Sequence, residues 1–200
     1  MLDPEGSSAE IDADDAVLGA KLRAVRKRSG ITLQDLATRT ALSTGTLSNI
    51  ERGINSPSLR TLRAICQAMD IDGAELFGVG SEQVDDTFGM VVRRSSRNRL
   101  NFRDQHVIKY RITPPTCEAM EAYLLQLDKN GGSGPEFYAS NGEKIFFVLS
   151  GRFEVEIEGK SVLLYEGDSF GCRRKVLHRW RNGWDKPTTV LLTNNSHFYV

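Results

Sequence analysis

The stretch EFYASNGEKIFFVLSG, residues 136–151, places side chains with binding chemistry at alternating positions. Glu136, Tyr138, Ser140 and Lys144 share one parity, so on an extended chain they point to the same side. The pattern predicts a strand, a glycine-containing turn and a second, apolar strand. Inside a β-barrel such a row is a natural place for metal ligands, yet it contains no histidine.

The elements around this row predict an antiparallel β-barrel or jelly roll over residues 91–200. Phe153, Val155 and Ile157 alternate with glutamates, which is the pattern of a half-buried strand. Glycine-containing turns recur at regular spacing with no helical stretch between them. The expected strands are HVIKYRI, MEAYLLQL, KIFFVL, RFEVEIEG, SVLLY, LHRWRN and TTVLLT.

Charge is distributed unevenly along the 200 residues, although it sums to zero. Residues 1–17 carry acidic side chains and no Lys or Arg, so we expect a disordered acidic tail there. Residues 18–77 carry nine basic and five acidic side chains. This asymmetry favours a module that meets a polyanion, with a solvated helical surface as the alternative. Three cysteines without metal-type spacing, and no signal peptide or membrane-length apolar run, favour a cytoplasmic protein.

Residues 18–78 have the periodicity of a five-helix bundle, with the first helix expected to begin at Leu18. Thr32 is expected to cap a second helix, LQDLATRT, and Ser43 a third, TGTLSNIER. The stretches NSPSLRTLRAICQAMD and GAELF supply a fourth and a fifth helix. The second and third helices, joined by the tight turn ALS, form a helix-turn-helix. A Gly- and acid-rich linker is expected over residues 79–90.

The third helix exposes short polar side chains beside its buried Leu47 and Ile50. Such side chains can approach base edges closely in the major groove of DNA. The expected base-reading residues are Thr44, Gly45, Thr46, Ser48 and Asn49. The residues expected to position phosphates are Ser43, Arg52 and Asn55.

The stretches LATRTALSTGTLSNIERG and PSLRTL resemble the XRE family of repressors, and the resemblance covers the whole module. It implies a repressor-like bundle that binds double-stranded DNA; a helical protein–protein module with the same pattern is the alternative. Two positions depart from the family. A phosphate-contacting Gln usually starts the second helix, where this chain has Leu33, so Thr32 or Gln34 is expected to replace it. The usual turn glycine is Ala41, which must adopt a less favourable backbone conformation.

The second module resembles the cupin family through GGSGPEFYASNGEKIFFVLSGRFEVEIEG, YEGDSF and HRWRN. Cupins ordinarily carry His-x-His, then Glu four residues later, and a further His, which together hold a divalent metal. The resemblance assigns these four positions to Tyr138, Ser140, Lys144 and His178. Since one ligand of four remains and an ammonium repels a cation, we expect no metal and no cofactor. A register that turns Glu143 inward would still supply only two ligands.

The order of the two modules resembles the XRE–cupin regulators of bacteria. The resemblance implies a transcriptional regulator whose barrel senses a small-molecule effector. We expect a homodimer on a palindromic operator, with the edges of the barrel's sheets pairing the copies. Two alternatives remain open: a cupin metalloenzyme (isomerase or dioxygenase) with an accessory DNA-binding module, and a DNA-binding protein whose barrel only dimerises.

We expect the effector to be anionic, because Lys144 places a side-chain cation where cupins place a metal. Tyr138 and Ser140 would donate hydrogen bonds to it. In the alternative case an internal carboxylate, Glu136 or Glu121, neutralises Lys144 and plugs the pocket. The expected ligand-binding set is Glu136, Tyr138, Ser140, Lys144, Phe146, His178 and Trp180.

Overall fold

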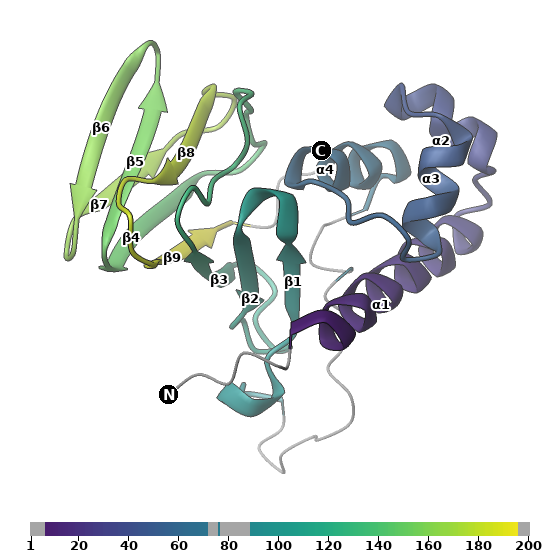
Figure 1. Ribbon diagram of the computed structural model, residues 1–200, viewed down its shortest axis with the longest axis horizontal. Coiled ribbons are helices and arrows are strands. Elements are labelled where there is room, and N and C mark those ends of the chain that lie inside the picture. The colour runs from purple at the N-terminus through teal and green to yellow at the C-terminus, as the bar shows by residue number, and fades with distance from the viewer. Residues whose placement is uncertain (1–6, 72–75, 77–88, 196–200) are drawn as a thin grey trace. The chain divides into compact units, whose positions relative to one another are not determined.

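The structure, a computed structural model, describes residues 7–71, 76 and 89–195, with side chains from residue 13 onward. The chain divides into two compact units, Met1–Gly78 and Val79–Val200. The first unit is helical and the second is built from β-strands, as Figure 1 shows. The predicted two-domain α + β fold class is thereby confirmed.

Hydroxyl side chains start three of the helices in the first unit, and two of them, Thr32 and Ser43, are the caps that the sequence predicts. Thr32, Ser43 and Ser58 each accept a hydrogen bond at 3.0–3.1 Å from the backbone N–H three residues on. Asp35 completes a capping box, because its carboxylate accepts the N–H of Thr32 at 3.0 Å. The helices are α1 (Ser7–Arg28), α2 (Leu33–Thr40), α3 (Thr44–Glu51) and α4 (Leu59–Met69).

Helix α1 begins at Ser7, which corrects the expectation of a disordered tail up to residue 17 and of a first helix from Leu18. Asp15 is buried, and a Cβ added to Gly53 would lie 2.6 Å from the Cα of Ala16. This segment therefore packs against the turn that follows α3. Its acidic composition suggests disorder, but acidic side chains near a helix N-terminus also complement the helix dipole.

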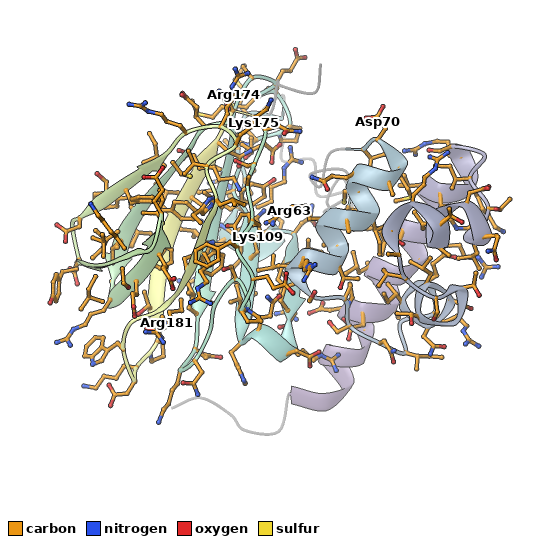
Figure 2. All side chains as sticks on the ribbon, turned by 90° about the horizontal axis from the view of Figure 1, so that it is seen from above. Arg63, Asp70, Lys109, Arg174, Lys175 and Arg181 are labelled. Carbon is orange, nitrogen blue, oxygen red and sulfur yellow. The ribbon has the colours of Figure 1, made fainter. Side chains whose placement is uncertain are left out.

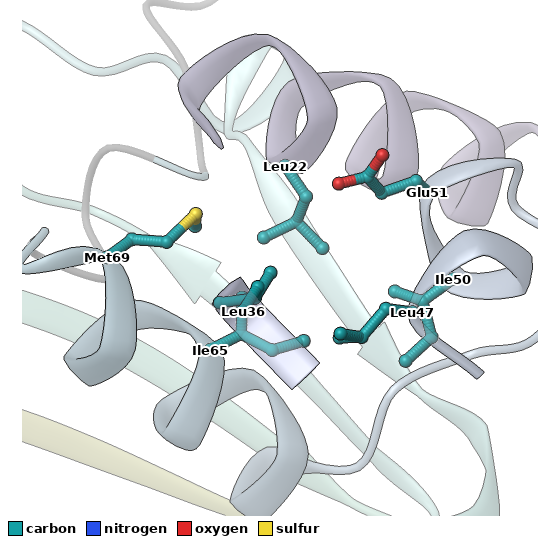
Figure 3. A pocket seen from close by; sticks show the side chains of 7 residues that line it. All are labelled: Leu22, Leu36, Leu47, Ile50, Glu51, Ile65 and Met69. Carbon is teal, nitrogen blue, oxygen red and sulfur yellow. The ribbon is translucent and has the colours of Figure 1, made fainter. Parts of the chain in front are cut away.

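The helical core lies where the four helices meet. Leu22 of α1, Leu36 of α2, Leu47 of α3 and Ile65 of α4 are almost fully buried. Together with Ile50, Glu51 and Met69 they line the narrow cavity drawn in Figure 3. All but Glu51 are apolar, so this cavity is a packing gap within the core. The predicted fifth helix, GAELF, falls outside the described residues except for Leu76, which is buried.

The second unit is a two-sheet β-sandwich of jelly-roll type. Its larger sheet has the strand order β1-β2-β3-β9-β4-β7, and its smaller sheet has the order β6-β5-β8. Phe146, Val148, Phe153 and Val155 point between the sheets and are fully buried. The strands are β1 (Arg99–Phe102), β2 (Val107–Arg111), β3 (Glu121–Leu127), β4 (Lys144–Ser150), β5 (Arg152–Ile157), β6 (Lys160–Tyr165), β7 (Ser169–Cys172), β8 (His178–Asn182) and β9 (Thr188–Asn194).

Seven of these strands match the predicted stretches, whereas β1 and β7 have no predicted counterpart. The expected strand before β4 is wrong. Residues 136–140 form only an isolated bridge, in which Tyr138 and His178 exchange two backbone hydrogen bonds at 3.0 Å. Gly134, with φ of +97°, and Pro135 precede this segment, and both disfavour a regular strand.

Candidate functional site

The first candidate site is the exposed side of α3. Thr44 and Gly45 are exposed, and Thr46, Ser48 and Asn49 are half-buried, on the side of the helix opposite Leu47 and Ile50. The structure thus places the five predicted base-reading residues on one helix with accessible surface. The space beside the first turn is open, since a Cβ added to Gly45 would meet only the Ser43 hydroxyl, at 3.7 Å.

Asn49 is held by its neighbours at the end of α3. Arg52 donates from Nη2 to the Oδ1 of Asn49 at 2.7 Å. The backbone carbonyl of Asn49 accepts from the N–H of Ile54 at 2.9 Å and from that of Asn55 at 3.4 Å. The three residues expected to act together at this end, Asn49, Arg52 and Asn55, therefore lie close to one another. This arrangement leaves the amide Nδ2 of Asn49 as the group able to meet an acceptor on a base edge.

At the start of α2 the structure distinguishes between the two residues expected to contact phosphate. The hydroxyl of Thr32 bonds to the carboxylate of Asp35 and accepts its N–H, so it is engaged in the capping box. Gln34 is exposed. Gln34 is therefore the side chain at this helix end with amide hydrogens available to a phosphate. The hydroxyl oxygen of Ser43 likewise accepts the N–H of Thr46, because Ser43 caps α3.

Two polar contacts between helices of the bundle are not among the sequence-based expectations. Arg26 of α1 and Glu51 of α3 form a buried ion pair, and Arg39 of α2 donates to the carbonyl of Ala68 of α4 at 2.9 Å. In the sequence Arg26 is one of several basic residues on a helix, and the helix alone gives no sign of the carboxylate that it will meet. The hydrogen bond to Glu51 raises the pKa of Arg26 above its ordinary value, whereas burial lowers it.

The second candidate site lies at one end of the barrel, around His178. His178 is fully buried, and its Nδ1 lies 2.9 Å from the carbonyl oxygen of Val176 and 3.2 Å from the Sγ of Cys172. Because a carbonyl oxygen only accepts, Nδ1 carries a proton. The ring of Tyr138 lies against that of His178, with the centroids 4.3 Å apart.

Aromatic side chains connect this histidine to the middle of the barrel. Trp180 donates from Nε1 to the hydroxyl oxygen of Tyr138 at 2.6 Å. Phe146 lies 6.3 Å from the ring of His178 and 6.4 Å from that of Trp180. Four members of the expected ligand-binding set, Tyr138, Phe146, His178 and Trp180, are thus brought together. They form an aromatic wall with polar groups on one side.

Lys144 lies beside this wall. Its Nζ is 5.1 Å from the centroid of the Tyr138 ring, which is within the range of a cation–π contact. Its backbone pairs with Cys172 on one side and with Asn194 on the other. Burial raises the pKa of the Cys172 thiol, and the Lys144 ammonium acts against that rise. Sequence reasoning does not find Cys172 and Asn194, because they reach Lys144 only through strand pairing.

The remaining expected ligand residues are less closely involved. Glu136 is exposed, and the hydroxyl of Ser140 donates to the carbonyl of Gly142 at 2.7 Å. The carboxylate of Glu121 is buried and accepts hydrogen bonds from Tyr123 and from Nη2 of Arg111, the latter at 3.0 Å. A residue expected to neutralise Lys144 in the plugged alternative thus has two other partners.

These residues do not fit a cupin metal centre. Three of the four positions that would hold a divalent cation carry Tyr138, Ser140 and Lys144, and the fourth carries His178. Across the described part of the chain, no three His, Cys, Asp or Glu side chains gather so that they could hold a metal ion. At these four positions a divalent cation would meet one imidazole and a repelling ammonium.

Comparison with known proteins identifies both units. Residues 17–76 match the model of a helix-turn-helix domain, and residues 123–194 match that of a cupin domain. The chain accordingly combines an XRE-type helix-turn-helix domain with a cupin domain. Across its described helices, none is both long and apolar enough to span a membrane.

Two named regulators match part of this chain. The HTH-type transcriptional regulator SlrR of Bacillus subtilis is 34% identical over 62 residues, which are 30% of this chain and 41% of SlrR. The transcriptional regulator ClgR of Mycobacterium tuberculosis is 42% identical over 55 residues, or 28% of this chain and 49% of ClgR. The chain therefore spans less than half the length of either relative.

One solved structure shares the fold of nearly the whole chain. It is a transcriptional regulator from Vibrio cholerae, with a TM-score of 0.68 and 18% sequence identity. The superposition covers 92% of this chain and 98% of that one. At this level of identity the similarity concerns the fold alone.

Proposed function

We propose that the protein is a sequence-specific DNA-binding transcriptional regulator that acts in the cytoplasm. The observation that carries this proposal is α3, which exposes short polar side chains while its apolar side is anchored in the bundle. The XRE-type sequence and the two relatives named as regulators support it. In this proposal α3 enters the major groove and Asn49 reads a base edge there.

The proposed regulator acts as a homodimer on double-stranded DNA. A single helix-turn-helix of this size buries little DNA surface, so tight binding requires two copies on a palindrome with half-sites about one helical turn apart. Gln34, Arg52 and Asn55 are the proposed phosphate-positioning residues, while Ser43 caps α3.

We further propose that the barrel senses a small anionic metabolite without a metal. Lys144 supplies the positive charge, and Tyr138 and His178 supply polar groups beside it. The carboxylate of Glu121 has Arg111 and Tyr123 as partners, and the proposed anion is an external one. Phe146 and Trp180 form the apolar wall of the proposed site.

DNA selection tests the first part of the proposal. The full-length protein is mixed with random-sequence duplexes, and the retained DNA is sequenced. Enrichment of one palindromic motif is expected, and no enrichment would contradict sequence-specific binding. The Asn49→Ala variant is the control, because it keeps the bundle while losing the proposed base-reading amide.

A pair of lysine variants tests the second part. Lys144→Met should abolish the thermal stabilisation given by small carboxylates such as succinate and citrate, with a diamine as the cationic control compound. Lys109→Met is the matched variant, since its Nζ also lies over a tyrosine ring, 3.6 Å from the centroid of Tyr123. Equal responses of the two variants, or preference for the diamine, would contradict an anionic ligand at Lys144.

The enzyme alternative has a weaker basis in the described residues. A metal-dependent isomerase or dioxygenase of the cupin type needs the ligand set that Tyr138, Ser140 and Lys144 replace. The alternative in which the barrel only dimerises predicts that no small anion changes the melting temperature of the cupin domain. The lysine variants above therefore distinguish it from sensing.

A further inference from the structure

The outward side of the larger sheet carries no charged side chain over four consecutive strands, all of which the structure describes. One row runs through paired residues from Leu124 of β3 to Leu191 of β9, Phe147 of β4 and Ser169 of β7. The next row continues the pattern with alanine, threonine, isoleucine and glycine. We call this surface the apolar face. Its residues are Ala122, Leu124, Gln126, Ile145, Phe147, Leu149, Ser169, Gly171, Thr189, Leu191 and Thr193.

Large apolar side chains of this face are open to solvent in the single chain. Ile145 is 54% exposed, Phe147 37% and Leu149 41%. They alternate along β4 with Phe146 and Val148, which are fully buried. Strand β4 is therefore apolar on both sides, whereas a strand that faces water on one side normally alternates apolar and polar residues.

The smaller sheet provides the contrast within the same domain. Its outward side pairs Glu156 with Arg179 at 2.5 Å and Glu154 with Arg181 at 2.7 Å. The side chain of Arg181, labelled in Figure 2, is 68% exposed. One sheet thus carries the ion pairs of a solvated surface, whereas the apolar face of the other has no charges to form them. Contiguous exposed apolar surface of this kind marks an interaction site.

We infer that the apolar face packs against the same face of a second copy of this chain. In a two-fold interface each patch meets itself, so any charge near the axis meets a like charge. A face without charge avoids this repulsion, whereas a surface that selects a different, charged partner requires complementary charge. The inference deepens the homodimer of the proposed function, on which it rests, by naming the surface that forms it.

The size of the sheet is compatible with such an interface. The four strands of the apolar face, at about 4.8 Å spacing and with about six residues at 3.3 Å each, give a projected area of about 380 Å². Stable interfaces bury roughly 600–1,000 Å² of accessible surface per partner, which exceeds projected area because side chains are corrugated. The apolar face therefore supplies the centre of such an interface, and residues around it must contribute the rest.

Packing of faces differs from the pairing of sheet edges expected from the sequence. The edge strands of the larger sheet, β1 and β7, have only four residues each. Short edges offer few unpaired backbone groups to a partner. In the face-packed dimer the apolar side chains of β4, and not the backbone of an edge, supply the contact.

Sedimentation velocity of the full-length protein tests the inference. The wild type is expected to be a dimer at micromolar concentration. Phe147→Lys and Ile145→Lys should each raise the dimer dissociation constant by more than about tenfold, because each copy would bury an ammonium. Leu163→Lys is the matched control: Leu163 is 38% exposed on the outward side of the smaller sheet, and this variant should dimerise like the wild type.

The outcomes separate this inference from the proposed function. A wild type that is monomeric at tens of micromolar overturns both the face-packed dimer and the proposed homodimer. This result is expected if another part of the chain, or a different protein, covers the apolar face. A dimer that resists both lysine substitutions overturns the face alone. Dimers that break as expected while selecting no DNA sequence support the face and contradict the regulator. Circular dichroism checks that each variant is folded. If Phe147→Lys does not fold, the result for Ile145→Lys decides.

Discussion

Arg26 and Glu51 form a bidentate ion pair inside the helical bundle. Arg26 donates from Nε to Oε1 of Glu51 at 2.6 Å and from Nη2 to Oε2 at 2.9 Å. A third donor of the same guanidinium, Nη1, binds the carbonyl of Ile31 at 2.7 Å. One side chain of α1 thus fixes both the end of α3 and the entry to α2. It sets the position of the helix proposed to read DNA.

Removing one partner of this pair should destabilise the helical unit strongly. Glu51→Gln or Arg26→Met leaves a buried group without its counter-charge, which costs about 3–5 kcal/mol. The double variant Arg26→Met/Glu51→Leu removes both charges and should recover a large part of the loss. Urea unfolding, followed by the helical circular dichroism signal, measures all four proteins. Equal stability of the single variants and the wild type would show that the pair contributes nothing.

Replacing Ala41 by glycine should stabilise the helical unit. It ends α2 with φ of +57° and ψ of +24°, a left-handed conformation that costs a non-glycine residue about 1–2 kcal/mol. Ala41→Gly removes that cost but adds freedom to the unfolded chain, so a net gain of about 0.5–1 kcal/mol is expected. The control is Ala37→Gly on the same helix, where a buried methyl is lost and stability should fall. A decrease for both variants would contradict the assigned backbone conformation.

Asn49 and Arg52 should affect DNA binding differently. Asn49→Ala is expected to lose about 1–3 kcal/mol on the selected operator and to relax base preference at one position of each half-site. Arg52→Ala should weaken binding to all sequences and reduce the salt dependence by about one phosphate contact. Since Arg52 also holds Asn49, the double variant should lose less than the sum. Fluorescence anisotropy on operator and random duplexes measures each loss, and equal losses of Asn49→Ala on both duplexes would exclude base reading.

The three cysteines should react at different rates. Cys117 is exposed, whereas Cys66 and Cys172 are buried, so a thiol reagent should modify Cys117 first and the others only on opening. In a Cys117→Ser background, Lys144→Met should shift the thiolate absorbance of Cys172 to higher pH, because the ammonium acts against the rise in pKa that burial causes. Mass spectrometry of the labelled peptides assigns each site. An unchanged pH profile would show that Lys144 lies too far from Cys172 to act on it.

Burial of Cys172 also predicts how stability depends on pH. Because burial raises the thiol pKa above its unfolded value of about 8.5, the unfolded state loses this proton first as pH rises. This contribution to stability is therefore complete below about pH 8 and falls above it. Cys172→Ala should flatten the decline of stability between about pH 8 and 10, compared with the wild type. The same slope in both proteins would contradict the prediction.

Most of the fold is predictable from the sequence because its local signals agree with the packing. Thr32 and Ser43 cap helices where the caps are expected, and alternation locates β5 within one or two residues. Strand β7 is not predictable in this way, because its four residues include Gly171 and carry no alternation. The expectation of a disordered tail fails because an acidic segment favours disorder until a partner surface, here the turn at Gly53, is present.

The candidate sites are predictable only where they lie on one element. The residues of α3 share a helix, so their spacing suffices to group them. At the barrel, parity groups Glu136 with Lys144, but the chain between them does not continue as a strand and Glu136 is exposed. Cys172 and Asn194 flank Lys144 through pairing between strands. Such pairing follows from topology, which a linear pattern does not contain.

The hydrogen bond from Trp180 to Tyr138 gives the barrel an optical reporter of its own. Indole emission depends on the polarity and hydrogen bonding around Nε1, and this donor ends on a phenol that also touches His178 and Lys144. Any molecule that moves Tyr138 on entering should change the fluorescence of Trp180. The only other tryptophan, Trp184, stacks near the side chains of Arg152 and Lys186. A Trp184→Phe protein would therefore permit label-free titration of candidate effectors at this one position.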